Sequence, residues 1–83
     1  MAPLDPSTVR SREELSDFLT ELGRRIEAGV VDLENLSTTG YIGAAAGWTA
    51  DLEGFFMNRG EPVPDEPSWS LVASIFLAAT IYE

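Results

Sequence analysis

Carboxylates are the side chains of this sequence that could do chemistry. Fourteen Asp and Glu stand against five Arg, and the sequence contains no His, no Cys and no Lys. The usual proton carrier near neutral pH, the thiolate nucleophile, the Schiff-base amine and the imidazole metal ligand are therefore all missing. Carboxylates alone could form an acid and base pair, bind a hard cation or attract a basic surface.

The spacing of these carboxylates does not favour catalysis or metal binding. Asp51, Glu53 and Asn58 form the tightest polar cluster on an apolar segment, but two residues at i and i+2 of a helix point about 200° away from each other. The sequence lacks the ligand spacing of an EF-hand loop, and it has no His or Lys that could activate a Ser or Thr hydroxyl. We therefore predict no catalytic residue, no metal and no cofactor. A carboxylate metal-binder or small enzyme is the last of three interpretations.

The net charge of −9 indicates the kind of partner. Because it repels nucleic-acid phosphates and anionic lipid headgroups, we predict binding to neither nucleic acid nor membrane, and a basic protein surface is the natural complement. Acidity that only keeps a small protein soluble is the other explanation. The sequence opens on an acid and prolines rather than on a signal peptide, and its longest apolar run, 71–82, is shorter than the roughly 20 residues that span a bilayer. We expect a cytoplasmic protein.

The spacing of apolar residues predicts an all-α fold, one three-helix domain over residues 1–83. An extended N-terminal segment, 1–10, comes first. A capping box of Ser11 and Glu14 then begins a helix over 11–28, which ends at Gly29. Its apolar stripe repeats at spacings of three and four residues, which predicts one buried face. The stripe consists of Leu15, Phe18, Leu19, Leu22 and Ile26.

The second helix is predicted over 38–58, with its cap among Ser37 to Thr39, and its glycines are unusual. Each interior glycine costs about 1 kcal/mol relative to alanine. The small residues of this segment form either a seam for close approach by another helix or a partner, or simply a cap and a bend. They are Gly40, Gly43, Ala44, Gly47, Ala50 and Gly54.

An extended proline-rich connection, 61–67, separates this helix from the last one, predicted over 68–82 with Ser68 as its cap. The last helix is apolar nearly all round, which is typical of a central helix or of one that meets a second chain. Large aromatic residues from all three helices are expected to share one core. They are Phe18, Trp48, Trp69 and Phe76.

Motifs of the second half resemble a small bacterial protein family of unknown function. They are Trp48, the run Asp51-Leu-Glu-Gly-Phe-Phe-Met-Asn-Arg-Gly60, Pro67-Ser-Trp69 and Ala78-Ala-Thr-Ile-Tyr-Glu83. The resemblance covers residues 36–83, with a looser match over 9–15, and it implies no activity. In size and charge alone, the small acidic members of that family are similar to the immunity proteins that accompany bacterial toxins.

The sequence thus predicts a non-enzymatic, acidic protein-binding module, an immunity-type inhibitor that occludes a basic surface of a toxin or nuclease effector. The outer face of the first helix concentrates carboxylates although Asp17 and Glu21 repel each other at i, i+4, while Glu21 pairs favourably with Arg25. A merely solvated face is the commoner reason for such charges. The alternative function is a homodimer that shares the small-residue stripe and the last helix. The predicted partner-binding residues are Glu13, Asp17, Glu21, Asp32, Glu34, Glu61, Asp65 and Glu66.

Overall fold

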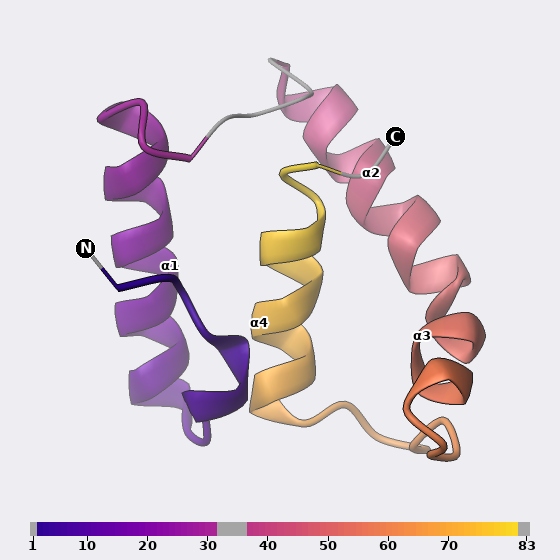
Figure 1. Ribbon diagram of the computed structural model, residues 1–83. Helices are drawn as coiled ribbons and strands as arrows, with labels where there is room; N and C mark the ends of the chain where they lie inside the picture. Colours follow the sequence, from indigo (N-terminus) through magenta and orange to yellow (C-terminus); the bar gives the residue numbers. More distant parts are fainter. Residues whose placement is uncertain (1, 32–36, 82–83) are drawn as a thin grey trace.

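The computed structural model describes residues 2–31 and 37–81, and the regular elements of these two stretches are all helical. A short 3-10 helix, η1 (Pro6–Thr8), precedes α1 (Arg12–Glu27), α2 (Thr38–Ala50), α3 (Leu52–Asn58) and α4 (Trp69–Ala78). The predicted all-α class is confirmed. Figure 1 shows α4 in the middle, with α1 and η1 on one side and α2 and α3 on the other. α1 and α4 run in the same direction, and α2 runs opposite to both.

Serine side chains begin α1, α2 and α4, as the sequence predicts. The Oγ atoms of Ser11, Ser37 and Ser68 each accept a hydrogen bond from the amide three residues later, at 3.1, 3.0 and 3.0 Å. Each bond satisfies one of the amides that the first helical turn leaves unpaired. At α1, Glu14 Oε1 accepts from the Arg10 amide at 3.0 Å, one residue before the amide that the capping box predicts.

Glycines end α1 and α3 with the same backbone pattern. Gly29 has φ 77° and Gly60 has φ 67°, a left-handed conformation that only glycine adopts at little cost. After α1, the Gly29 amide donates to the carbonyl of Ile26 at 3.1 Å, and the Val30 amide donates to that of Arg25 at 2.9 Å. These two bonds define a Schellman motif, so the predicted stop at Gly29 is confirmed.

The prediction of one helix over 38–58, and hence of three helices, is wrong at Asp51. This residue ends α2 and precedes α3 with φ −94° and ψ 12°. The Asp51 amide donates to the Trp48 carbonyl at 3.1 Å, and the Gly54 amide donates to the Asp51 carbonyl at 3.0 Å. Such i to i+3 bonds tighten the chain into a turn. Glycines on both sides weaken the preference for a continuous helix, so the segment divides at a residue type that favours helix ends.

The core lies between α1, α4 and the N-terminal segment. Val9, Phe18, Leu22 and Ala73 are its buried centre, none of them more than 7% exposed. All five residues of the predicted α1 stripe belong to this cluster, so its buried face is confirmed. The partly buried residues packed around the centre are Leu4, Leu15, Leu19, Ile26, Val31, Phe76 and Leu77.

The N-terminal segment is predicted to be extended over 1–10. It instead contains η1, and its residue Val9 belongs to the core. Asp5 Oδ1 accepts a hydrogen bond from the Ser7 amide at 3.0 Å, and Pro6 stands at the first position of η1. The proline fixes φ and lacks only an amide that would be unpaired there. The resulting turn directs Val9 into the core, where it is 3% exposed.

The two tryptophans lie outside this core cluster. Trp69 is 44% exposed, so the prediction that it is a core residue is wrong. It follows directly on residues 61–68, which are all exposed and leave it uncovered. Trp48 is half-buried and packs edge-to-face on Phe55, with ring centroids 5.1 Å apart. Phe55 packs in the same way on Phe56, so α2 and α3 carry an aromatic cluster of their own.

Tyr41 attaches α2 to α4. Its hydroxyl donates to the carbonyl of Phe76 at 2.6 Å, and the two rings stack with centroids 6.5 Å apart. Burial raises the pKa of Tyr41 above its ordinary value of 10.0. The hydroxyl therefore remains a donor at neutral pH.

Candidate binding surface

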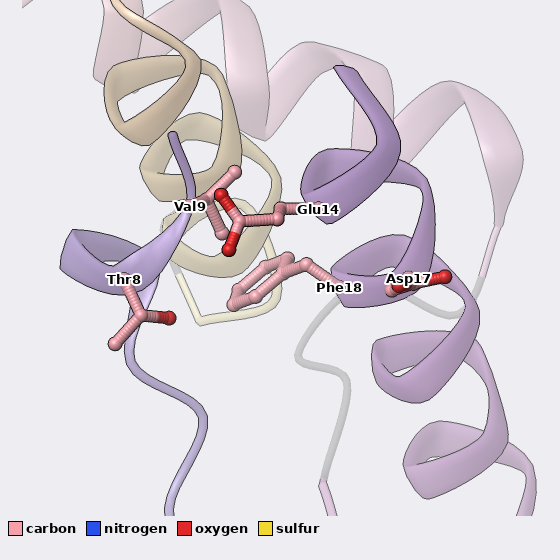
Figure 2. A pocket seen from close by; sticks show the side chains of 5 residues that line it. All are labelled: Thr8, Val9, Glu14, Asp17 and Phe18. Carbon is pink, nitrogen blue, oxygen red and sulfur yellow. The ribbon is translucent and has the colours of Figure 1, made fainter. Parts of the chain in front are cut away.

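Glu13 and Asp17 lie exposed in the first half of α1. Glu13 has Arg12 as a neighbour at 3.8 Å, but the two side chains are 69% and 82% exposed, so their ion pair contributes little. Asp17 borders a hollow of about 300 Å³ together with Glu14 and Phe18. Figure 2 shows the Glu14 carboxylate turned toward Val9, and Asp17 turned away from the Phe18 ring. Asp17 is thus open to a partner, whereas the Glu14 carboxylate accepts a hydrogen bond from the Arg10 amide.

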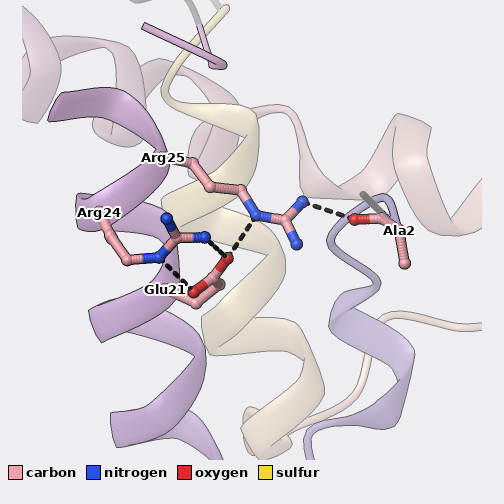
Figure 3. A network of polar contacts seen from close by, with 4 residues as sticks. All are labelled: Ala2, Glu21, Arg24 and Arg25. Carbon is pink, nitrogen blue, oxygen red and sulfur yellow. Dashed lines mark hydrogen bonds and ion pairs between the residues drawn. The ribbon is translucent and has the colours of Figure 1, made fainter. Parts of the chain in front are cut away.

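Glu21 is held inside an ion-pair network on the same helix (Figure 3). Its carboxylate accepts from Arg24 Nε at 2.9 Å, from Arg24 Nη2 at 2.6 Å and from Arg25 Nε at 2.6 Å. The hydrogen bonds from Arg24 and Arg25 lower the pKa of Glu21 from 4.5 to about 2. The predicted pair with Arg25 is confirmed. Two cations also offset the expected repulsion between Asp17 and Glu21.

The same network fastens the N-terminal segment to α1. Arg25, whose side chain is only 12% exposed, donates through Nη1 to the carbonyl of Ala2 at 2.6 Å (Figure 3). Because Glu21 fixes the Arg25 guanidinium, it acts on the fold through that arginine. Glu21 is therefore a less suitable partner contact than the sequence predicts, and its reversal would disturb the structure.

Three more of the predicted acidic residues, Glu61, Asp65 and Glu66, lie after α3 and not on α1. Glu61 follows α3 and accepts from Arg59 Nε at 3.1 Å. Asp65 and Glu66 are exposed in the segment that leads to α4. α1 and α3 lie on opposite sides of α4 (Figure 1), so Glu61 does not form one patch with the carboxylates of α1. The remaining two predicted residues, Asp32 and Glu34, lie outside the described residues.

At Gly43 and Gly54, the small residues of α2 and α3 do not form a seam against another helix of the described chain. A methyl group added at Gly43 or at Gly54 would meet no atom within 4 Å. Both glycines are exposed. No other helix of the described chain therefore approaches them closely, and this face is open.

A shallow apolar groove of about 400 Å³ lies over α4, and the sequence does not reveal it. It is lined from three separate parts of the chain. α4 and its last turn supply the floor, α2 and α3 supply one wall, and η1 supplies the other, as the order of helices in Figure 1 allows. The only signal in the sequence is the apolar circumference of the last helix. The lining residues are Pro6, Trp48, Phe55, Ser74, Leu77, Ala78, Thr80 and Ile81.

Comparisons with known proteins bear on the family alone. The model of a family of unknown function matches residues 11–83, which leaves out η1 and the core residue Val9. No curated protein and no solved structure matches the chain. Across residues 2–31 and 37–81, no helix is long and apolar enough to cross a membrane. In the same stretches, no three acidic side chains are grouped so that they could hold a metal ion.

Proposed function

The chain belongs to DUF7660, a family of unknown function, and we propose that it is a non-enzymatic module that binds a basic surface of another protein. The observation that carries this proposal is the surplus of exposed carboxylates. Within the described residues, four arginines share only three carboxylates in ion pairs, those of Glu13, Glu21 and Glu61. Further exposed acidic residues include Asp17, Glu27, Glu53, Asp65 and Glu66.

A toxin or nuclease effector would present the surface that this charge complements. A protein that acts on nucleic acid carries clustered Lys and Arg, because it must bind phosphates. An acidic module that covers such a cluster would block access of the nucleic acid. We therefore propose an immunity-type inhibitor that acts in the cytoplasm. Its lack of His, Cys and Lys supports binding over catalysis.

The experiment is affinity capture from the cells that produce the protein, with identification of bound proteins by mass spectrometry. We expect a basic partner whose capture falls at about 1 M salt, where the Debye length is about 3 Å. The double variant Glu13→Lys/Asp17→Lys should lose this partner, because it reverses the open charges of α1. Glu21 stays unchanged, since its substitution would also loosen the N-terminal segment.

Glu27→Lys/Glu53→Lys is the matched control. It changes the net charge equally, and both residues are exposed, at the end of α1 and in α3. It should retain the partner. If both double variants lost the partner equally, the effect would be due to net charge alone. Capture of an acidic partner, or unchanged capture by Glu13→Lys/Asp17→Lys, would refute the proposal.

A homodimer is the second candidate, and exposed apolar side chains favour it. A second chain could cover them, since large apolar patches mark association sites. Sedimentation equilibrium at micromolar concentration decides: a single 9.0 kDa species would refute the dimer. The exposed apolar residues are Val30, Ile42, Met57, Val63, Trp69 and Ile81.

A further inference from the structure

We infer that the apolar groove over α4 holds an amphipathic, basic helix of the protein partner. This inference rests on the proposed function and names the part of the partner that is recognised. The shape of the floor, the two walls and the charges beside them each point to such an occupant.

The floor of the groove is one face of a helix. Ser74, Leu77, Ala78 and Ile81 follow at spacings of three, one and three residues, which places them on the same side over two turns. The last turn continues past α4, since the Ile81 amide donates to the Ala78 carbonyl at 3.1 Å. Ile81 is 68% exposed and offers most of its apolar surface to a ligand. A helix with apolar residues at i, i+3, i+4 and i+7 matches a floor of this form.

The residues that line the two walls are held in place by contacts within the chain itself. On one side Trp48 is held by its edge-to-face contact with Phe55 at 5.1 Å. On the other side Pro6 is fixed in η1, whose first turn Asp5 caps. Tryptophans in such partly open, apolar positions often carry much of a binding energy. Rigid walls also reduce the entropy that binding costs.

A carboxylate stands beside each wall. Asp5 directly precedes Pro6, and its bonds from the Ser7 hydroxyl and amide, at 2.7 and 3.0 Å, lower its pKa. Asp51 stands at the junction of α2 and α3, three residues after Trp48 and four before Phe55. Both acidic residues are exposed, so Lys or Arg at the edges of a bound helix would meet opposite charge on both sides.

The charge near the groove disfavours a second copy of this chain as the occupant. The nearby cation Arg59 lies 5.2 Å from the centroid of the Phe55 ring, and Glu61 neutralises it at 3.1 Å. A second copy would bring its own Asp5 and Asp51 to the same edges and a further net charge of −9. Like charges placed opposite each other oppose association.

Calorimetric titration with a designed peptide tests the inference. The probe is a helical peptide of about 18 residues, long enough to form turns in water, with Leu at i, i+3, i+4 and i+7 and Lys elsewhere. A peptide with Glu in place of Lys and a scrambled Leu/Lys peptide are the comparison probes. We expect only the amphipathic Leu/Lys peptide to bind. Equal binding of the Glu peptide or of the scrambled peptide would overturn the inference.

Ile81→Lys and Met57→Lys are the matched variants. The two residues are 68% and 69% exposed, and only Ile81 lines the groove. Ile81→Lys should weaken binding of the Leu/Lys peptide at least about tenfold, and Met57→Lys less than about twofold. Thermal melts of both variants verify the fold. Equal weakening by both, or by neither, would overturn the inference.

The outcomes separate this inference from the proposed function. If a captured basic partner is lost by Glu13→Lys/Asp17→Lys but retained by Ile81→Lys, the groove is not its site and the proposed function stands. If capture gives no basic partner, the proposed function fails whatever the peptide does. If the wild type sediments as a dimer and Ile81→Lys as a monomer, a second copy occupies the groove and the inference is refuted.

Discussion

The two sides of α4 are held in different ways. On the α1 side, Val9, Phe18 and Leu22 are buried against Ala73, and the Arg25 bond to Ala2 fastens the N-terminal segment. On the α2 and α3 side, most side chains are half-buried or exposed, and four glycines lie within the two helices. From this difference we infer that the α1 side supplies most of the stability of the fold, and that apolar and aromatic surface on the other side is available to a partner.

This division explains why a small chain can keep exposed apolar groups. A domain of this size has a narrow margin of stability, so its best packing must be concentrated. The α1 side achieves this with a continuous stripe and satisfied helix ends. The α2 and α3 side, held to α4 by contacts such as the Tyr41 hydrogen bond, is free to carry the wall of a groove.

The largest effect should come from the core. Phe18→Ala removes a 7% exposed ring and should lower the free energy of unfolding by about 3–5 kcal/mol, leaving much of the chain unfolded. Trp69→Ala is the contrasting variant and should cost less than about 1 kcal/mol, because Trp69 is 44% exposed. Thermal melts followed by circular dichroism measure both. A Trp69→Ala loss as large as that of Phe18→Ala would place Trp69 in the core after all.

A medium effect is expected on the other side of α4. Trp48→Ala removes a half-buried ring and its contact with Phe55, and should cost about 1–2 kcal/mol. Ile42→Ala, at a position 58% exposed on the same helix, is the control and should change stability by less than about 0.5 kcal/mol. Urea unfolding measures both. A loss from Trp48→Ala that equals the loss from Phe18→Ala would remove the difference between the two sides.

Glycine substitutions should act in opposite directions. Gly43→Ala and Gly54→Ala should each stabilise the protein by about 0.5–1 kcal/mol, since the added methyl group meets no atom within 4 Å. Gly29→Ala should instead destabilise it by about 1–2 kcal/mol, because φ is 77° there. The check is the urea midpoint of each variant. Destabilisation by Gly43→Ala would indicate that the open face of α2 has a role in the fold that its surroundings do not show.

The smallest of the expected effects is a change in how the stability of the α1 side depends on pH in acid. Because folding lowers the pKa of Glu21 from 4.5 to about 2, its contribution is complete above pH 4.5 and is lost as the pH falls toward 2. Glu21→Gln should therefore flatten the dependence of the free energy of unfolding on pH between these values. Urea titrations across this window measure it, with Glu27→Gln on the same helix as the control. An unchanged slope in Glu21→Gln would contradict the structural role of the ion pair.

Local features of the fold could be predicted from the sequence. The caps at Ser11, Ser37 and Ser68 and the stop at Gly29 depend on hydrogen bonds within a few residues, so the sequence contains all their determinants. The α1 stripe could be predicted for the same reason, since helical periodicity alone defines its face. The Glu21 pair with Arg25 follows from i, i+4 spacing.

Features that depend on distant segments could not be predicted. Whether Val9 or Trp69 is buried depends on which element lies beside it, and neither periodicity nor capping states this. The break at Asp51 depends on small differences in helix preference that packing can reverse. The groove needs Pro6, Trp48 and Ile81 to meet from three parts of the chain. The structure shows that Glu13 and Asp17 are exposed, but their role in binding a partner stays a prediction.

The most direct test of the difference between the two sides is native-state hydrogen exchange, measured residue by residue. Amides of α1 and of the α4 turns around Ala73 should exchange only through global unfolding, with the highest opening free energy in the molecule. Amides of α2 and α3 should exchange through a local opening of clearly lower free energy, because few fully buried side chains hold these helices. One common opening free energy for α1, α2, α3 and α4 would contradict the account.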